Sequence, residues 1–175
     1  MDSQSIITSK ILIAQSRTHV IRTSEGLYCH HIDENRANML SDGKFAATNP
    51  FEYQEASRLV YCNLLKHLIL HAKIAENPNI QTNKGELPGI GGAINFICRD
   101  LNDIYAGKKY ADKWRKVVAK KVKDNFDYIV ILRYLWEVIE SNNPIYKDII
   151  IKDRLYISLN GKVVKEVMKA LSDSE

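Results

Sequence analysis

The chain has 175 residues, of which 45% are hydrophobic and 26% are charged, so it can bury a core and is neither a disordered nor a collagen-like chain. No apolar run approaches about 18 residues, and the N-terminus lacks the basic and apolar segments of a signal peptide. Three cysteines without a Cys-x-x-Cys pair argue against a disulfide framework and a cysteine zinc site. These features predict a cytoplasmic protein that spans no membrane.

The first half of the chain is predicted to contain two short strands between two helices. Residues 3–16 are apolar and β-branched, and we expect a helix there, although periodicity alone also allows a strand. A turn at 24–26 precedes an aromatic and β-branched strand at 27–32. The polar segment 33–57 is expected to be a long loop with at most a helical turn, and 58–62 to be a second strand.

The pattern changes at Asn63, a preferred N-cap residue because its side-chain oxygen accepts from free amides of the first helical turn. Residues 64–76 then consist mainly of good helix formers, and Asn77-Pro78 ends the segment. The sequence therefore predicts a capped helix directly after the second strand.

The second half is predicted to be mainly helical, with helices at about 93–105, 111–123 and 126–141. Asn160-Gly161 is a hairpin turn signal, and the segment 163–171 is expected to be a last helix.

Four of the five histidines form two pairs. His30 and His31 end the first predicted strand, and His67 and His71 lie four residues apart on the capped helix. The i, i+4 spacing places both helix imidazoles on one face, within reach of a single ion. Successive strand side chains point to opposite faces, but this rule relaxes at a strand end. One strand imidazole can therefore join the helix pair while its neighbour faces a substrate.

The helix histidines also have a simpler interpretation. Either one alone, in a segment as apolar as 64–71, is well explained as a buried, neutral side chain bonded to backbone. The combination of a His-His pair, two strands and a His-x3-His helix favours a metal site instead.

These residues resemble the HNH branch of the ββα-metal nucleases, in the form with a His-His pair and two helix histidines seen in nuclease colicins and many phage and bacterial HNH proteins. The similarity covers roughly residues 24–77 and implies a β-hairpin and a helix that together hold one divalent metal. Carried over by position, it implies that His30, His67 and His71 are metal ligands and that His31 is the general base. The expected products of DNA cleavage are 5′-phosphate and 3′-hydroxyl ends.

The sequence departs from the family pattern before the second strand. The asparagine whose amide usually holds the hairpin and orients the base is replaced by Arg58, after a long loop. Asn35, Asn38 or Asn49 could supply the amide, and the sequence does not choose among them.

The expected chemistry is hydrolysis of a phosphodiester. An imidazole with an ordinary pKa near 6.5 suits a base that deprotonates water, so His31 is the candidate. Three histidine ligands leave coordination positions open for water and phosphate. An all-imidazole set favours zinc or nickel on affinity, whereas the resemblance implies magnesium or manganese as the working ion.

A basic stretch is the candidate nucleic-acid contact. Residues 107–123 carry eight lysines and arginines against one aspartate, a local charge of +7 in a chain with a formal net charge of +4. Such cations neutralise phosphates, although a basic run can also be simply a solvated helix face. The predicted DNA contacts are Arg58, Lys108, Lys109, Lys113, Arg115, Lys116 and Lys120.

The glycine-rich segment 87–92 resembles a dinucleotide fingerprint only superficially, since no strand precedes it and the third glycine is missing. We interpret it as the entry to a helix, where glycine permits close packing on the nuclease core and free amides could contact a DNA phosphate.

The sequence thus predicts an α+β fold: an N-terminal segment at 1–23, an HNH ββα-metal module at 24–77 and a mainly helical extension at 78–175 that contacts DNA or forms a homodimer. The predicted function is that of a small metal-dependent endodeoxyribonuclease, of a restriction or mobile-element type. Two rival hypotheses remain. One is a non-catalytic, basic, helical nucleic-acid-binding protein with a structural metal site, and the other is a helical module whose basic helix binds an acidic protein partner.

Overall fold

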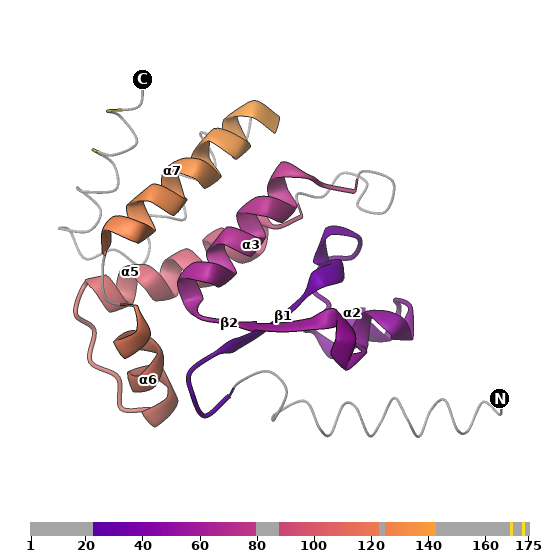
Figure 1. Ribbon diagram of the computed structural model, residues 1–175, viewed down its shortest axis with the longest axis horizontal. Helices are drawn as coiled ribbons and strands as arrows, with labels where there is room; N and C mark the ends of the chain where they lie inside the picture. Colours follow the sequence, from indigo (N-terminus) through magenta and orange to yellow (C-terminus); the bar gives the residue numbers. More distant parts are fainter. Residues whose placement is uncertain (1–22, 80–87, 123–124, 143–168, 170–172, 174–175) are drawn as a thin grey trace.

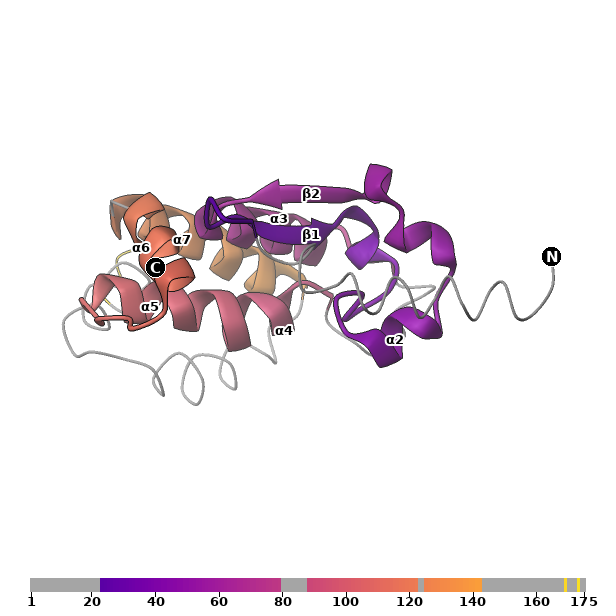
Figure 2. The ribbon, with the colours of Figure 1, turned by 90° about the horizontal axis from the view of Figure 1, so that it is seen from below.

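The computed structural model describes residues 23–79, 88–122, 125–142, 169 and 173. Within these ranges the protein combines one two-stranded antiparallel sheet with several helices, so the predicted α+β class is confirmed (Figures 1 and 2). The helix predicted at 3–16, the turn at 160–161 and nearly all of the segment 163–171 lie outside the described residues.

The sheet is a hairpin whose two strands are separated by 27 residues of chain. β1 (Tyr28–His31) pairs with β2 (Leu59–Cys62), with Tyr28 opposite Cys62 and His31 opposite Leu59. Both strands were predicted to within two residues at each end. The register places His30 opposite Val60 and next to the helix that follows β2.

The segment between the strands differs from the expected loop. It contains the 3₁₀ turns η1 (Ile32–Asn35), η2 (Phe51–Gln54) and η3 (Ala56–Arg58), and the short helix α2 (Gly43–Ala47). Asp42 begins α2, since its side chain accepts a hydrogen bond from the Lys44 amide. Each element is three to five residues long, too short for a helical period to appear in the sequence.

Helix α3 (Leu64–Glu76) follows β2 after a single residue, and the predicted cap is confirmed because Asn63 Oδ1 accepts from the Lys66 amide at 2.9 Å. One side of α3 contacts the hairpin and another packs along α7 (Asn125–Asn142) (Figures 1 and 2). α3 therefore joins the strands to the rest of the molecule.

The helix predicted at 93–105 begins earlier and is not regular. It consists of α4 (Ile90–Gly92), the π-helical segment η4 (Ala93–Cys98) and α5 (Arg99–Tyr105) in succession. The next helix, α6 (Lys113–Lys121), is shorter than the predicted 111–123. It starts at Asp112, whose side chain accepts from the Arg115 amide at 2.7 Å.

One hydrophobic core unites the described helices. Its fully buried members include Leu68 and Ala72 of α3, Ala93 of η4 and Leu101 of α5. Tyr128 of α7 is also fully buried, and its hydroxyl donates to Asn102 Oδ1 at 2.8 Å, which satisfies a polar group in the core. Among the described helices, none combines the length and the apolar character needed to cross a bilayer.

Candidate metal centre

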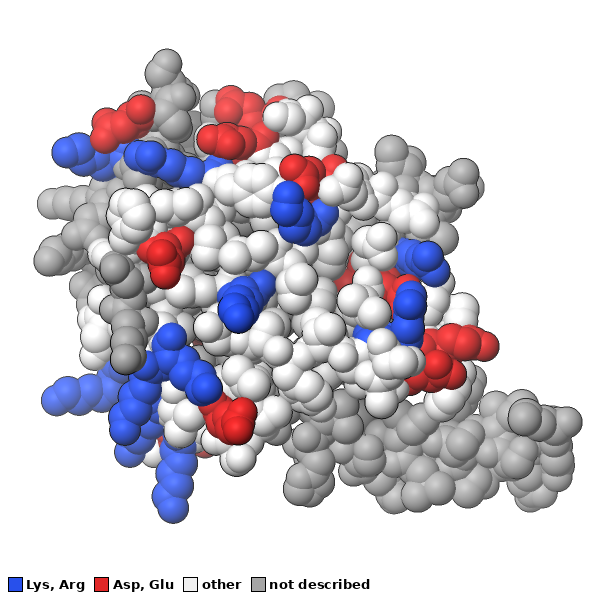
Figure 3. All heavy atoms as spheres, in the orientation of Figure 1, with Lys and Arg blue, Asp and Glu red and all other residues white. Residues whose placement is uncertain are grey.

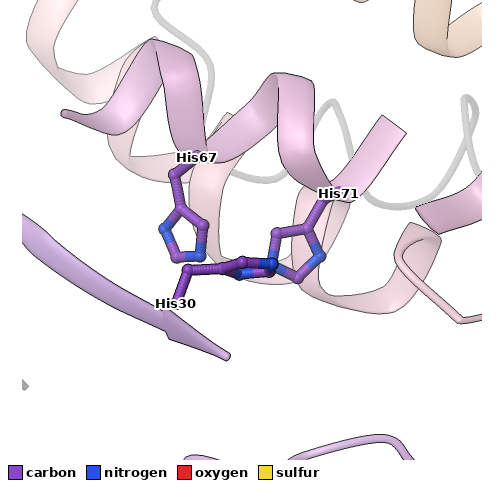
Figure 4. Close-up of side chains that lie close together, drawn as sticks. All are labelled: His30, His67 and His71. Carbon is purple, nitrogen blue, oxygen red and sulfur yellow. The ribbon is translucent and has the colours of Figure 1, made fainter. Parts of the chain in front are cut away.

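The three predicted metal ligands come together between the hairpin and α3. His30 extends from β1, and His67 and His71 extend from successive turns of α3 toward it (Figure 4). One ligand atom from each lies within 4.8 Å of the other two, and the ring centroids are 4.9 to 5.2 Å apart. These three histidines form a group that can hold a metal ion.

The imidazoles are neutral in this environment. Burial, together with a smaller effect of the neighbouring imidazoles, lowers the pKa of His30 to about 3 and that of His67 to about 2. Burial also lowers the pKa of His71 to about 4, against a smaller opposing effect of a backbone hydrogen bond. Neutral imidazole is the form that binds metals, so no proton has to be displaced near pH 7.

The polar atoms of the cluster fit a cation. Nδ1 of His30 and Nδ1 of His67 are buried, and neither has a hydrogen-bond partner in the part of the chain that the structure describes. Buried polar atoms without partners are rare in native proteins. A cation coordinated by the three imidazoles would compensate for burying these rings.

His71 is oriented by the glycine-rich segment. Its Nδ1–H donates to the Gly89 carbonyl at 3.0 Å, which fixes the tautomer and leaves the Nε2 lone pair for a metal. A Cβ on Gly92 would lie 2.3 Å from Cε1 of His71, so only glycine allows this approach. The close packing predicted for this segment is thus realised against the ring of His71, one of the three histidines that can hold a metal ion.

We therefore expect Gly92→Ala to displace the His71 ring and to lower the affinity for Mn²⁺ about 10- to 100-fold, the usual effect of disturbing a group that orients a ligand. Calorimetric titration of the purified variant measures this. Gly91→Ala is the matched control, because a Cβ there meets only the Asn95 side chain at 4.0 Å. Equal affinities for the two variants would contradict the positioning role.

A carboxylate that was not identified from the sequence borders the cluster. Glu34 lies on η1, which folds it back beside the strand, and its Oε2 is 3.5 Å from Nδ1 of His30 and 3.6 Å from Nε2 of His71. The side chain is 14% exposed, and burial raises its pKa to about 7. No spacing rule indicates this contact, because it depends on the 3₁₀ turn after β1.

His31 does not belong to the group of three. It is buried, and its Nε2 lies 3.1 Å from Oε1 of Gln54, whose own Nε2 donates to the Leu40 carbonyl. That second bond turns Oε1 toward His31, so Nε2–H of His31 is the donor and Nδ1 is the basic nitrogen of the neutral ring. The amide against the predicted base is thus Gln54, which was not among Asn35, Asn38 and Asn49.

Arg58 is engaged within the fold. Its guanidinium makes two hydrogen bonds to Asp33, one of them from Nε to Oδ2 at 2.7 Å, and Asp33 is buried. This bidentate pair connects the start of β2 to η1, the turn that carries Glu34. A DNA contact by Arg58 stays a prediction.

The basic stretch divides into paired and unpaired cations. Lys108 pairs with Asp103, and Arg115 lies 3.6 Å from Asp100. Lys113, Lys116 and Lys120 are exposed on α6 and form no ion pair with any described residue. Lysine and arginine side chains gather over α6 at the lower left of the molecule (Figure 3).

A cleft leads to the histidines. It has a volume of about 800 Å³, and Glu34, His67 and His71 line it together with Phe45 of α2 and Phe96 of η4. Both phenylalanines are exposed, at 47% and 68%. The cleft is large enough to admit a nucleotide-sized group to the side chains of His67 and His71.

The buried imidazoles predict that the metal-free protein is acid-sensitive. As pH falls from 6.5 to about 4, the unfolded chain protonates these three histidines while the folded protein keeps them neutral, so stability is lost. The raised pKa of Glu34 has the opposite effect on stability between pH 7 and 4.5, because the folded protein then binds a proton that the unfolded chain does not. This single group offsets only part of the effect of the three histidines. We expect the free energy of unfolding to decrease by about 2 kcal/mol per pH unit near pH 5.5.

Urea unfolding in EDTA at pH 7, 6 and 5 tests this expectation. The variant His67→Ala removes one of the three groups and should show a shallower dependence on pH. A free energy of unfolding that is constant or rises toward pH 5 would contradict it.

Comparisons with protein-family models, with curated proteins and with solved structures find no match to this chain. The function is therefore argued from the site itself.

Proposed function

We propose that this protein is a metal-dependent endonuclease of the HNH type, which hydrolyses phosphodiester bonds in DNA. The observation that carries the proposal is the convergence of His30, His67 and His71, from a β-hairpin and the helix that follows it, beside a cleft that His67 and His71 line. Three neutral imidazoles leave positions for water and a phosphate oxygen on the same ion, as in catalytic rather than structural sites. The order strand, strand, helix supports the ββα-metal assignment of residues 24–77.

Each group of the chain has a proposed role. The three histidines hold a divalent ion, magnesium or manganese in the cell, which when bound stabilises negative charge on the phosphorane and on the leaving oxygen. His31 is the general base that accepts a proton from the attacking water, and its contact with Gln54 holds the ring in one tautomer. The cleft admits the scissile phosphate.

A cleavage assay tests the proposal. Supercoiled plasmid is incubated with the purified protein and Mg²⁺ or Mn²⁺, with an EDTA control, and nicked and linear products are measured. We expect metal-dependent nicking, and double-strand breaks if a homodimer places two sites on one duplex. Failure to cleave with any of several divalent ions, on duplex and single-stranded DNA, would refute the endonuclease.

A second candidate function is non-catalytic DNA binding around a structural metal. The observation in its favour is the exposed lysine face of α6, which needs no active site to bind phosphates. DNA binding with bound metal but without cleavage would identify this alternative.

Both candidates predict the same electrostatic interface. Replacing Lys116 and Lys120 by alanine should weaken DNA binding and reduce the salt dependence of log K by about 0.9 for each phosphate that the variant no longer neutralises. Lys73→Ala is the control, since this lysine lies on α3, outside the predicted contacts, and is paired with Glu76. Titrations at several salt concentrations measure the slope, and an unchanged slope in the double variant would exclude α6 from the interface.

A further inference from the structure

The Glu34 carboxylate lies close to two of the candidate metal-ligand nitrogens. Its Oε2 lies between Nδ1 of His30 and Nε2 of His71, at 3.5 and 3.6 Å. These separations exceed the usual 2.7–3.2 Å of a hydrogen bond, and Nδ1 of His30 has no hydrogen-bond partner among the described residues. Two donor atoms that each bind one ion at about 2.1 Å lie about 3.0 to 3.4 Å apart. The two observed separations are slightly longer than this range, so a small movement of the Glu34 side chain would give its oxygen the spacing of a neighbouring ligand.

No other cation in the described ranges accounts for this buried carboxylate. Arg36 and Arg58 both pair with Asp33 instead. Among the described residues, the groups within 4.0 Å of Glu34 that could pair with it are the imidazoles of His30 and His71. A buried carboxylate is normally paired with a cation or bound to a metal, so a metal fits this position.

We propose that Glu34 is the fourth protein ligand of the metal, which makes the site a three-histidine, one-carboxylate set. This inference deepens the proposed function, because it determines which ions support cleavage. Four protein ligands complete a tetrahedral zinc ion and leave it no position for substrate. A six-coordinate ion such as Mn²⁺ keeps two positions open, and a carboxylate oxygen suits it better than imidazole alone.

The ligand role is tested by metal affinity rather than by activity. Mn²⁺ is titrated calorimetrically into the wild type, Glu34→Gln and Asp100→Asn. Asp100 is the matched control because it lines the same cleft but binds the Tyr28 hydroxyl and neighbours Arg115. We expect the dissociation constant to rise at least about tenfold for Glu34→Gln and to change less than about twofold for Asp100→Asn. Equal dissociation constants for the wild type and Glu34→Gln would overturn the proposal.

Glu34→Asp separates ligation from charge. It keeps the negative charge but shortens the side chain by one methylene, so a ligand loses reach while a purely electrostatic group does not. We expect weaker Mn²⁺ binding than in the wild type. Wild-type affinity in Glu34→Asp together with weak binding in Glu34→Gln would show that Glu34 acts through charge and is not a ligand. Unfolding of each metal-free variant in urea establishes that it is folded.

The dependence of cleavage on the bound ion is a second test of the proposed ligand set. We expect wild-type protein loaded with Zn²⁺ to be inactive on plasmid and protein loaded with Mn²⁺ to cleave it, and cleavage by the zinc form would overturn the closed zinc site. The affinity and cleavage measurements test the ligand role of Glu34 and the nuclease activity separately. Tight Mn²⁺ binding that depends on Glu34, without cleavage by any form, would support the ligand and refute the nuclease.

Discussion

Replacing His67 by alanine is expected to lower Mn²⁺ affinity by at least about 100-fold and to reduce plasmid cleavage about 10³-fold or more. The ring supplies one of three convergent nitrogens, and its loss leaves an incomplete ligand set. Alanine is the best helix former and keeps the backbone hydrogen bond from residue 67 to the Asn63 carbonyl, while Nδ1 of the His67 side chain has no partner among the described residues. The variant should therefore remain folded, as circular dichroism would show.

His19→Ala is the control for losing a histidine, since His19 belongs to neither histidine pair in the sequence. It should bind metal and cleave DNA as the wild type does. If His67→Ala retains full metal affinity, the cluster is not the metal site, and the endonuclease loses its main support.

Replacing His31 by alanine is expected to reduce the rate of cleavage by about 10²- to 10⁴-fold, the usual contribution of a general base, with Mn²⁺ affinity within about twofold of the wild type. The two effects separate because His31 contacts Gln54 and is not among the three convergent histidines. Single-turnover cleavage at saturating metal, together with calorimetric titration, measures both quantities.

Gln54→Ala provides a graded comparison. It removes the acceptor that holds Nε2–H of His31 but leaves the ring in place, so we expect a smaller loss of rate than in His31→Ala. A rate in His31→Ala equal to that of the wild type would exclude this residue as the base.

The parts of the fold that follow local rules were predictable from sequence. Asn63 and the helix formers after it defined α3, and β-branched and aromatic residues defined both strands. The short elements between the strands were not predictable, because three to five residues carry no period. The π-helical segment η4 was also missed, since its register is set by packing of Ala93 and Cys98 in the core rather than by any residue preference.

The site shows the same division. The spacing of His67 and His71 was sufficient to predict their convergence, because one helical turn brings them together. Glu34 and Gln54 could not be assigned, since their contacts depend on how η1 and η2 fold back on the hairpin. The glycine-rich segment was recognised as a place of close packing, but only the structure identifies the ring at Gly92 as that of His71.

Helix α3 packs against both the hairpin and the other helices. This double packing determines the smallest part of the chain that could be transplanted with the metal centre. A fragment ending at residue 77 would keep all four paired histidines but would uncover Leu68 and Ala72, which are fully buried in the common core. Asn142 at the far end of α7 also donates to the Ala75 carbonyl near the end of α3. Any transplant of this metal centre into another scaffold must therefore carry α7 with it or supply an equivalent apolar surface.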